Sequence, residues 1–237
     1  MFTKSSRENL ESLFLRHGDV LDISTYIEKG EKPPYELLVK FMRGETDPPI
    51  DKESSTKLIQ EKISSGEIKK GDFDIIICSS ALRGRQTAEL VRGLVDADIE
   101  VHPSDYLKEV KFPMDDITPE YYEQAKDMSE VRNKFIDSFL NGNIIDEGPV
   151  DVYKRANNFL TYLRRINKYT NRQPLFISHG FFARTLDLAI SYQDEKFTDE
   201  QIAELMRKEF TQTKRPKPLG GFRLLSSSEN TNIISII

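Results

Sequence analysis

Two of the three histidines in this chain stand in the same local setting, with neighbours suited to chemistry. His17 lies in the run LFLRHG and His179 in the run LFISHG, so each follows a short apolar stretch and precedes a glycine. Arginines accompany them, because Arg16 directly precedes His17 and Arg83 follows the apolar run FDIIICSS. Chance placement explains this repetition poorly, and we predict that the four residues share one site.

These residue types fit phosphoryl transfer. That reaction needs a nucleophile in line with the leaving oxygen, positive donors around the equatorial oxygens, and a proton source for the leaving group. A neutral imidazole serves as the nucleophile, and the guanidinium groups of Arg16 and Arg83 offer a planar fork of donors to phosphate oxygens. Their charge also disfavours a protonated His17. We therefore predict His17 as nucleophile and His179 as a second donor to the phosphoryl group.

The elements that must position these residues alternate along the chain. Apolar runs typical of buried strands cover residues 13–15, 73–78, 99–102 and 175–178, and helical spacing covers 56–63, 86–94, 152–166 and 182–190. This alternation predicts an α/β fold, a three-layer α/β/α sandwich around a mostly parallel sheet. Ligands bind outside the carboxyl edge of such sheets, and the candidate residues follow three of the four strands.

At these residues the chain resembles the histidine phosphatase superfamily, in its phosphoglycerate-mutase-like branch. The runs LFLRHG, CSSALRGRQTA and LFISHG resemble three ordered motifs of that family, and GETDPPID resembles the segment before its first long helix. The resemblance extends from about residue 13 to the C-terminal tail. It implies that His17 is phosphorylated and then hydrolysed, with Arg16, Arg83 and His179 forming the phosphate pocket. We expect neither a metal nor an organic cofactor.

The resemblance also implies an acidic proton donor a few positions beyond the third strand. The matching run YLKEV nominates Glu109, while Asp19, Asp105 and Asp115 remain alternatives. Positioned acid catalysis of this kind contributes roughly a hundredfold to ten-thousandfold in rate.

Three small residues beside the motifs are further candidates for substrate binding. Gly18 and Gly180 would let the backbone approach a ligand closely. Ser79 would either donate a hydrogen bond to the substrate or satisfy the backbone of the turn. His102 and Arg85 lie outside the motif positions, and we expect both to be exposed or structural.

Departures from the family pattern bear on the reaction. The residue after RHG is Asp19, where the family commonly has Glu or Gln, and Pro149 and Val150 replace a polar pair in the run DEGPVDVYKR. The chain also contains no tryptophan. Because a mutase must hold a bisphosphorylated intermediate away from water, these departures favour a phosphatase that hydrolyses a phosphate monoester of a small anionic substrate. A phosphoglycerate-mutase-type phosphomutase and a non-catalytic phosphate-binding module are the alternatives.

We expect one domain over residues 1–237 with insertions at 19–49 and 111–150. The first insertion carries a helical pattern at Tyr35–Met42, and the second a helical lid over 118–140 that opens with Thr118 as N-cap and Pro119 after it. Thr198 with Gln201 fits a capping box. The C-terminal tail predicts a closing hairpin.

Composition narrows the partners. A formal charge of -5 and a pI near 5.4 argue against a nucleic-acid-binding surface. The single cysteine, Cys78, excludes a disulfide within the chain and is expected to be a buried apolar residue. The N-terminus lacks the apolar core of a signal peptide, and no stretch reaches membrane-spanning length. We expect a soluble, cytoplasmic protein whose partner is a small-molecule phosphate ester, not a membrane.

Overall fold

A six-stranded sheet forms the centre of the molecule. The structure is a computed structural model, and it describes residues 10–21, 26, 31–169, 172–212, 220–227 and 230–236. The strands are β1 (Leu10–Arg16), β2 (Ile75–Ser79), β3 (Glu100–Ser104), β4 (Pro174–Ser178), β5 (Gly221–Ser226) and β6 (Thr231–Ile236). Their order in the sheet is β3-β2-β4-β1-β5-β6. The first four are parallel, and the last two add an antiparallel hairpin beside β1.

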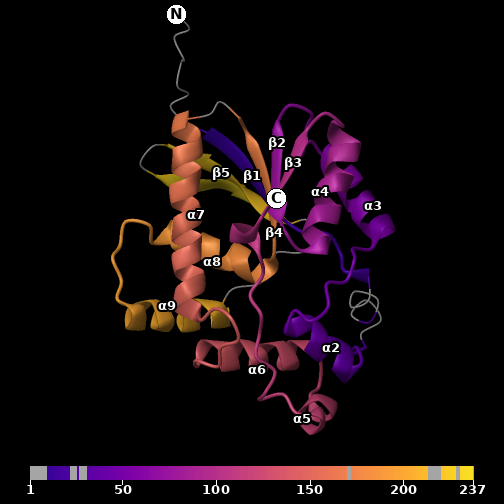
Figure 1. The fold of residues 1–237 in the computed structure, drawn as a ribbon, viewed down its shortest axis with the longest axis vertical. Coiled ribbons are helices and arrows are strands. Elements are labelled where there is room, and N and C mark those ends of the chain that lie inside the picture. The colour runs from indigo at the N-terminus through magenta and orange to yellow at the C-terminus, as the bar shows by residue number, and fades with distance from the viewer. Residues whose placement is uncertain are drawn as a thin grey trace, which may run out of the picture.

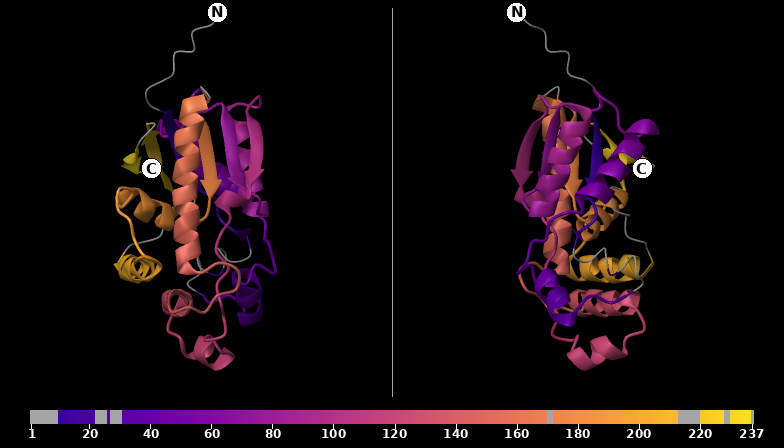
Figure 2. Two further views of the ribbon diagram at one scale, coloured as in Figure 1. Left: turned by 60° about the vertical axis from the view of Figure 1, so that its left-hand side comes forward. Right: turned by 90° about the vertical axis from the view of Figure 1, so that its right-hand side faces the viewer.

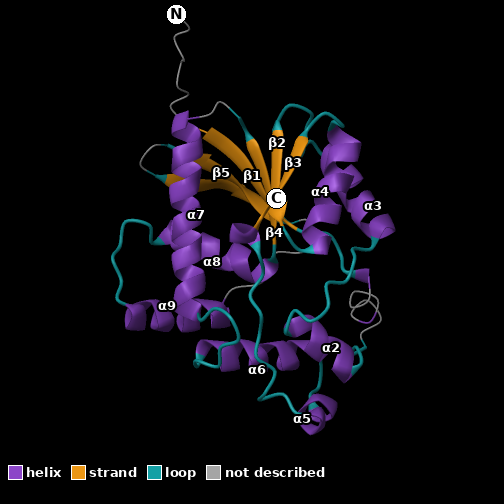
Figure 3. Cartoon of the chain, in the orientation of Figure 1, coloured by secondary structure: helices purple, strands orange, loops and turns teal. Residues whose placement is uncertain are grey.

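Helices cover both faces of this sheet, as Figures 1 and 3 show. The helices are α2 (Tyr35–Met42), α3 (Lys52–Ser64), α4 (Leu82–Val95), α5 (Pro119–Gln124), α6 (Met128–Leu140), α7 (Pro149–Tyr169), α8 (Gly180–Ser191) and α9 (Asp199–Gln212), with one 3-10 turn, η1 (Asp105–Leu107). Leu13 and Leu15 of β1 pack with α3 and α4, whereas Phe14 packs with α7 and α8. Successive side chains of one strand thus pack in opposite layers, because they point to opposite faces of the sheet.

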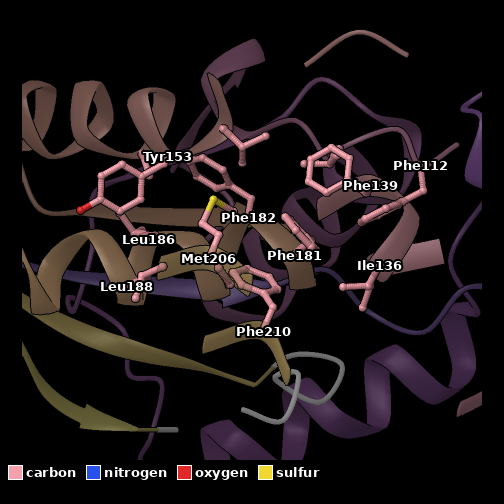
Figure 4. Close-up of a cluster of buried hydrophobic side chains, with 14 of the residues drawn as sticks. Phe112, Ile136, Phe139, Tyr153, Phe181, Phe182, Leu186, Leu188, Met206 and Phe210 are labelled. Carbon is pink, nitrogen blue, oxygen red and sulfur yellow. The ribbon is translucent and has the colours of Figure 1, made fainter. Parts of the chain in front are cut away.

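Additional helices lie beyond the carboxyl ends of the parallel strands. In Figure 2 the strand arrowheads point toward the end of the molecule that holds α2, α5 and α6. Helix α6 belongs to the main core, because the ring of Phe139 contacts both Phe112 and Phe181, the last of which lies in α8. Figure 4 shows these rings in one cluster, in which Phe181 lies beside Phe210 of α9. Helices α2, α5 and α6 therefore lie at the end of the sheet where the motif residues are.

Most predictions about these elements are confirmed. The α/β fold, the mostly parallel sheet, the closing hairpin and the helix at Tyr35–Met42 are all present. Thr118 caps the Tyr121 N–H with Pro119 at the first helical position. Thr198 and Gln201 bond reciprocally to each other's backbone N–H groups. The division into one domain with two insertions stays a prediction, and part of the first insertion, residues 22–25 and 27–30, lies outside the described residues.

Two predictions about secondary structure are wrong in detail. The run at 99–102 was expected to be a buried strand, but β3 lies at the sheet edge with most of its side chains exposed. The helical pattern over 118–140 is two helices, because the Asp127 side chain accepts the N–H groups of Ser129 and Glu130 and so begins a new helix. As expected, Cys78 is buried, and His102 and Arg85 are exposed. No helix within the described ranges has the length and apolarity to cross a membrane.

Candidate active site

The two motif histidines meet because their strands are neighbours. His17 follows β1 and His179 follows β4, and these strands pair in parallel. The His17 N–H donates to the carbonyl of Ser178 at 2.9 Å, which joins the two strand ends. The two imidazole centroids lie 5.0 Å apart with their planes at 60°, and both side chains are buried. The parallel register therefore brings together two residues that are 162 positions apart in the numbering of the chain (179 − 17 = 162).

The contact of His17 with its own neighbour assigns a proton to one ring nitrogen. Nδ1 of His17 lies 2.7 Å from the carbonyl oxygen of Gly18. A carbonyl only accepts hydrogen bonds, so Nδ1 carries a proton. In the neutral form of the ring, the lone pair is then on Nε2.

His179 has the opposite tautomer. The Arg83 Nε–H donates to Nδ1 of His179 at 3.3 Å, so Nδ1 holds the lone pair and Nε2 carries the proton. Nε2 then donates to the Ser79 hydroxyl at 2.7 Å. Burial lowers the pKa of His179 well below its usual value, and the nearby charges of Arg83, His17, Arg16 and Arg155 act in the same direction. His179 is therefore neutral at neutral pH.

Arg83 lies in the first turn of α4, where the run GETDPPID supplies its carboxylate partner. Nη1 of Arg83 is 3.1 Å from an Asp47 oxygen, and the other Asp47 oxygen accepts the N–H of Leu82 at the start of the same helix. The guanidinium lies 5.2 Å from the centroid of the Phe41 ring. Burial lowers the pKa of Arg83, while the negative charges of Glu109 and Asp47 oppose that shift. Asp47 and Phe41 thus orient a guanidinium that was predicted to bind phosphate.

Arg16 is the last residue of β1 and its side chain is half-buried. Its backbone N–H donates to the carbonyl of Gly220 at 2.9 Å. Arg16 thus lies at the carboxyl end of β1, next to His17, as the sequence predicted.

Glu109 lies at the N-terminus of α8. Its Oε2 accepts the Phe181 N–H at 3.2 Å and its Oε1 accepts the Phe182 N–H at 3.3 Å. The positive end of a helix suits a carboxylate. His179 is the N-cap of this same helix, so the predicted proton donor and the second histidine share one helix end.

The three alternative acids have other partners. Asp19 accepts from the Ser54 hydroxyl at 2.7 Å, Asp105 from the Ser80 hydroxyl at 2.5 Å, and Asp115 pairs with Arg43 at 3.0 Å. Glu109 differs from them because its carboxylate bonds the helix end that His179 caps. Its role as proton donor stays a prediction.

The small candidate residues have roles in packing and orientation. A Cβ on Gly18 would lie 2.3 Å from the Ser55 hydroxyl oxygen, and the Gly18 N–H donates to Thr87, so close approach of α3 and α4 explains this glycine. Ser79 accepts the Ala81 N–H at 3.3 Å besides contacting His179, which satisfies the turn and holds the ring. Gly180 is the buried first residue of α8. Substrate contact by these three residues stays a prediction.

Sequence reasoning missed Arg155 and its partner Glu147. Arg155 is 8% exposed and forms a double hydrogen bond with Glu147, at 2.9 and 3.0 Å. Both residues lie in the run DEGPVDVYKR, whose resemblance to a family segment was the only signal, because nothing in its spacing marks a buried arginine.

Within the described part of the chain, no group of three or more His, Cys, Asp or Glu side chains is arranged to hold a metal ion. The expectation that the reaction needs no metal and no organic cofactor stays a prediction.

Comparison with known proteins identifies the family. Residues 13–211 match the model of the histidine phosphatase superfamily, branch 1. Because this match covers most of the sequence, the chain belongs to the histidine phosphatase superfamily. A search of curated proteins found no match.

Solved structures share the fold at low sequence identity. A phosphoglycerate mutase from Bacillus anthracis has 12% identity and a TM-score of 0.58, with 97% of this chain and 93% of that chain covered. A phosphoserine phosphatase from Entamoeba histolytica, solved with phosphoserine, has 20% identity and a TM-score of 0.57, with 96% and 95% covered. An ecdysone phosphate phosphatase from Bombyx mori, solved with tungstate, has 13% identity and a TM-score of 0.54, with 97% and 92% covered.

Proposed function

We propose that this protein is a phosphatase that hydrolyses a phosphate monoester of a small anionic substrate through a phosphohistidine on His17. The observation that carries the proposal is the tautomer of His17, whose Nδ1 is held by the Gly18 carbonyl so that the lone pair is on Nε2. Its neighbours support the same chemistry, because the site combines neutral His179 with the guanidinium groups of Arg16 and Arg83.

The reaction proceeds in two displacements. In the first, Nε2 of His17 attacks phosphorus, the bond to the ester oxygen breaks, and the departing oxygen takes a proton from the Glu109 carboxyl group. In the second, water attacks the phosphorus and the P–N bond breaks. The Glu109 carboxylate takes the proton of that water, and inorganic phosphate leaves. Arg16 and Arg83 stabilise the charge on the phosphoryl oxygens in both steps, and His179 does so when its Nε2–H turns from the Ser79 hydroxyl to a phosphoryl oxygen.

Hydrolysis is favoured over transfer between two substrate positions by the sequence. The chain lacks tryptophan and has Asp19 after RHG, so it departs from the pattern with which a mutase retains its intermediate. The proposal takes the enzyme to be cytoplasmic and independent of metal, with a small phosphate ester as its partner.

The test is the His17→Ala variant, which we expect to lose phosphatase turnover and acid-labile labelling from a radiolabelled phosphate ester. His102→Ala is the matched control, because His102 is exposed and pairs with Glu100 on the edge strand, and it should retain both. The assay uses a panel of sugar phosphates, nucleotides and phosphopeptides. Retained turnover in His17→Ala contradicts the proposal. Phosphoryl transfer faster than phosphate release identifies a phosphomutase instead, and ligand binding without hydrolysis by the unmodified protein identifies a binding module.

A further inference from the structure

The loop that carries Glu109 has its backbone held by side chains from other elements. From the last two residues of η1 into the irregular segment that follows it, three successive carbonyls each accept a side-chain hydrogen bond. The carbonyls of Tyr106 and Lys108 both accept from Nη1 of Arg155, at 2.9 and 3.0 Å. The carbonyl between them, on Leu107, accepts from the Ser178 hydroxyl at 2.8 Å. The loop is therefore anchored to α7 and β4.

The guanidinium group of Arg155 is held in a fixed orientation. Its Nε and Nη2 bond the two oxygens of Glu147, so the guanidinium plane is fixed while Nη1 reaches the loop. Glu147 also balances a charge that is almost fully buried, which a buried arginine requires. A lysine has no planar fork and could not make the bidentate pair and the two carbonyl bonds together.

The same guanidinium contacts the second anchor of Glu109. It lies 4.4 Å from the centroid of the Phe182 ring. The backbone N–H of Phe182 is one of the two donors that hold the Glu109 carboxylate. Arg155 therefore touches the residue before Glu109 in the chain and the residue that receives its side chain.

We propose that Arg155, fixed by Glu147, is the positioning residue that aims the Glu109 carboxyl group at the leaving oxygen of the substrate. The inference rests on the proposed function, since it assigns Glu109 the proton for that oxygen. Arg155 exchanges no proton itself. Its removal leaves the nucleophile His17 in place and loosens only the acid.

This separation predicts a selective defect. An aryl ester such as p-nitrophenyl phosphate departs as a stable phenolate and needs little protonation, whereas an alkyl phosphate depends on the acid. We expect Arg155→Met to slow phosphorylation of His17 by an alkyl phosphate about a hundredfold or more, the scale of lost acid catalysis. Phosphorylation by p-nitrophenyl phosphate should slow only a few-fold. Both rates are measured as alcohol or phenol released in the first turnover, because hydrolysis of the phosphohistidine uses Glu109 whichever ester was the substrate. Glu109→Gln should show the same selectivity, and the double variant should lose little beyond either single one, because both remove one function.

Arg184→Met is the matched control. Arg184 is 7% exposed, donates to the carbonyl of Phe210 at 3.0 Å and stacks on that ring at 4.2 Å, so it is buried like Arg155 but anchors α9. Its loss should affect both esters equally. Glu147→Gln keeps the shape of the pair and tests the same idea if Arg155→Met fails to fold, with a smaller selective loss expected.

The inference is overturned if Arg155→Met or Glu147→Gln loses activity equally on both esters. It is also overturned if the losses multiply when Arg155→Met is combined with Glu109→Gln. These results require an active unmodified protein, so they leave the proposed function standing. If the unmodified protein hydrolyses neither ester and takes up no label on His17, the proposed function is wrong, and the inference about Arg155 falls with it.

Discussion

The strand ends of β1 and β4 present a histidine in the same sequence setting, yet the two rings are protonated on opposite nitrogens. His17 donates a hydrogen bond from Nδ1 to the carbonyl of the glycine that follows it. His179 instead receives a hydrogen bond from Arg83 on Nδ1 and donates from Nε2 to Ser79. The contrast shows that the partner of the ring, which the sequence motif does not specify, decides which nitrogen of a histidine carries the proton.

The largest test of this contrast compares the two rings as catalysts. We expect His179→Ala to lower kcat about a hundredfold to a thousandfold, the usual effect of removing one donor to a developing anion. It should still form phosphohistidine on His17, unlike His17→Ala. The measurement is steady-state turnover together with acid-labile labelling. His179→Gln, which keeps an N–H donor, serves as the control and should retain more activity. Loss of labelling in a folded His179→Ala would erase the distinction.

A second test concerns Gly18, the glycine that follows His17. Gly18→Ala would bring a methyl group within 2.3 Å of the Ser55 hydroxyl oxygen and 2.9 Å of the Ser55 Cβ. We expect it to destabilise the protein by about 1–3 kcal/mol, the usual cost of overpacking. The free energy of unfolding from urea titration measures this loss. As the control, Gly18→Ala should cost less stability in a Ser55→Gly background than in the unmodified protein, because the clashing hydroxymethyl group is then absent. A fully stable Gly18→Ala would show that the contact relaxes without cost.

The smallest expected effect is on the pH dependence of stability, and it compares buried His179 with exposed His102. Because the pKa of His179 is lowered in the folded protein, the unfolded chain binds a proton below about pH 6.5 while the native ring stays neutral. Stability must therefore fall as the pH drops below that value, by at most about 1.4 kcal/mol per pH unit from this group. His179→Gln should remove this component, whereas His102→Gln should retain it. Urea titrations at about pH 7 and about pH 5.5 measure the slope. The same slope in both variants would refute the assignment.

Periodicity and motif position predicted the sheet, its parallel order and the meeting of His17, His179, Arg16 and Arg83, because strand ends in a parallel sheet share one edge. The edge position of β3 was not predictable from its apolar run, since pairing partners are a property of the whole sheet. Arg155 escaped notice for a related reason. Its burial depends on Glu147 and on the carbonyls of Tyr106 and Lys108, and the two carbonyl contacts join segments that are 47 and 49 positions apart. The nomination of Glu109 came from family resemblance alone, and nothing in the sequence indicated that its carboxylate would bond the N-terminus of α8.

The shared aromatic core of α6 and α8 has a consequence for how the enzyme would select its substrate. Phe139 of α6 contacts Phe181, the residue whose N–H helps to hold Glu109. Swinging α6 outward would expose these rings to water and remove support from the N-terminal end of α8, at a large loss of burial free energy. We therefore expect discrimination among phosphate esters to come from the static shape of this end of the molecule rather than from a gate that opens and closes.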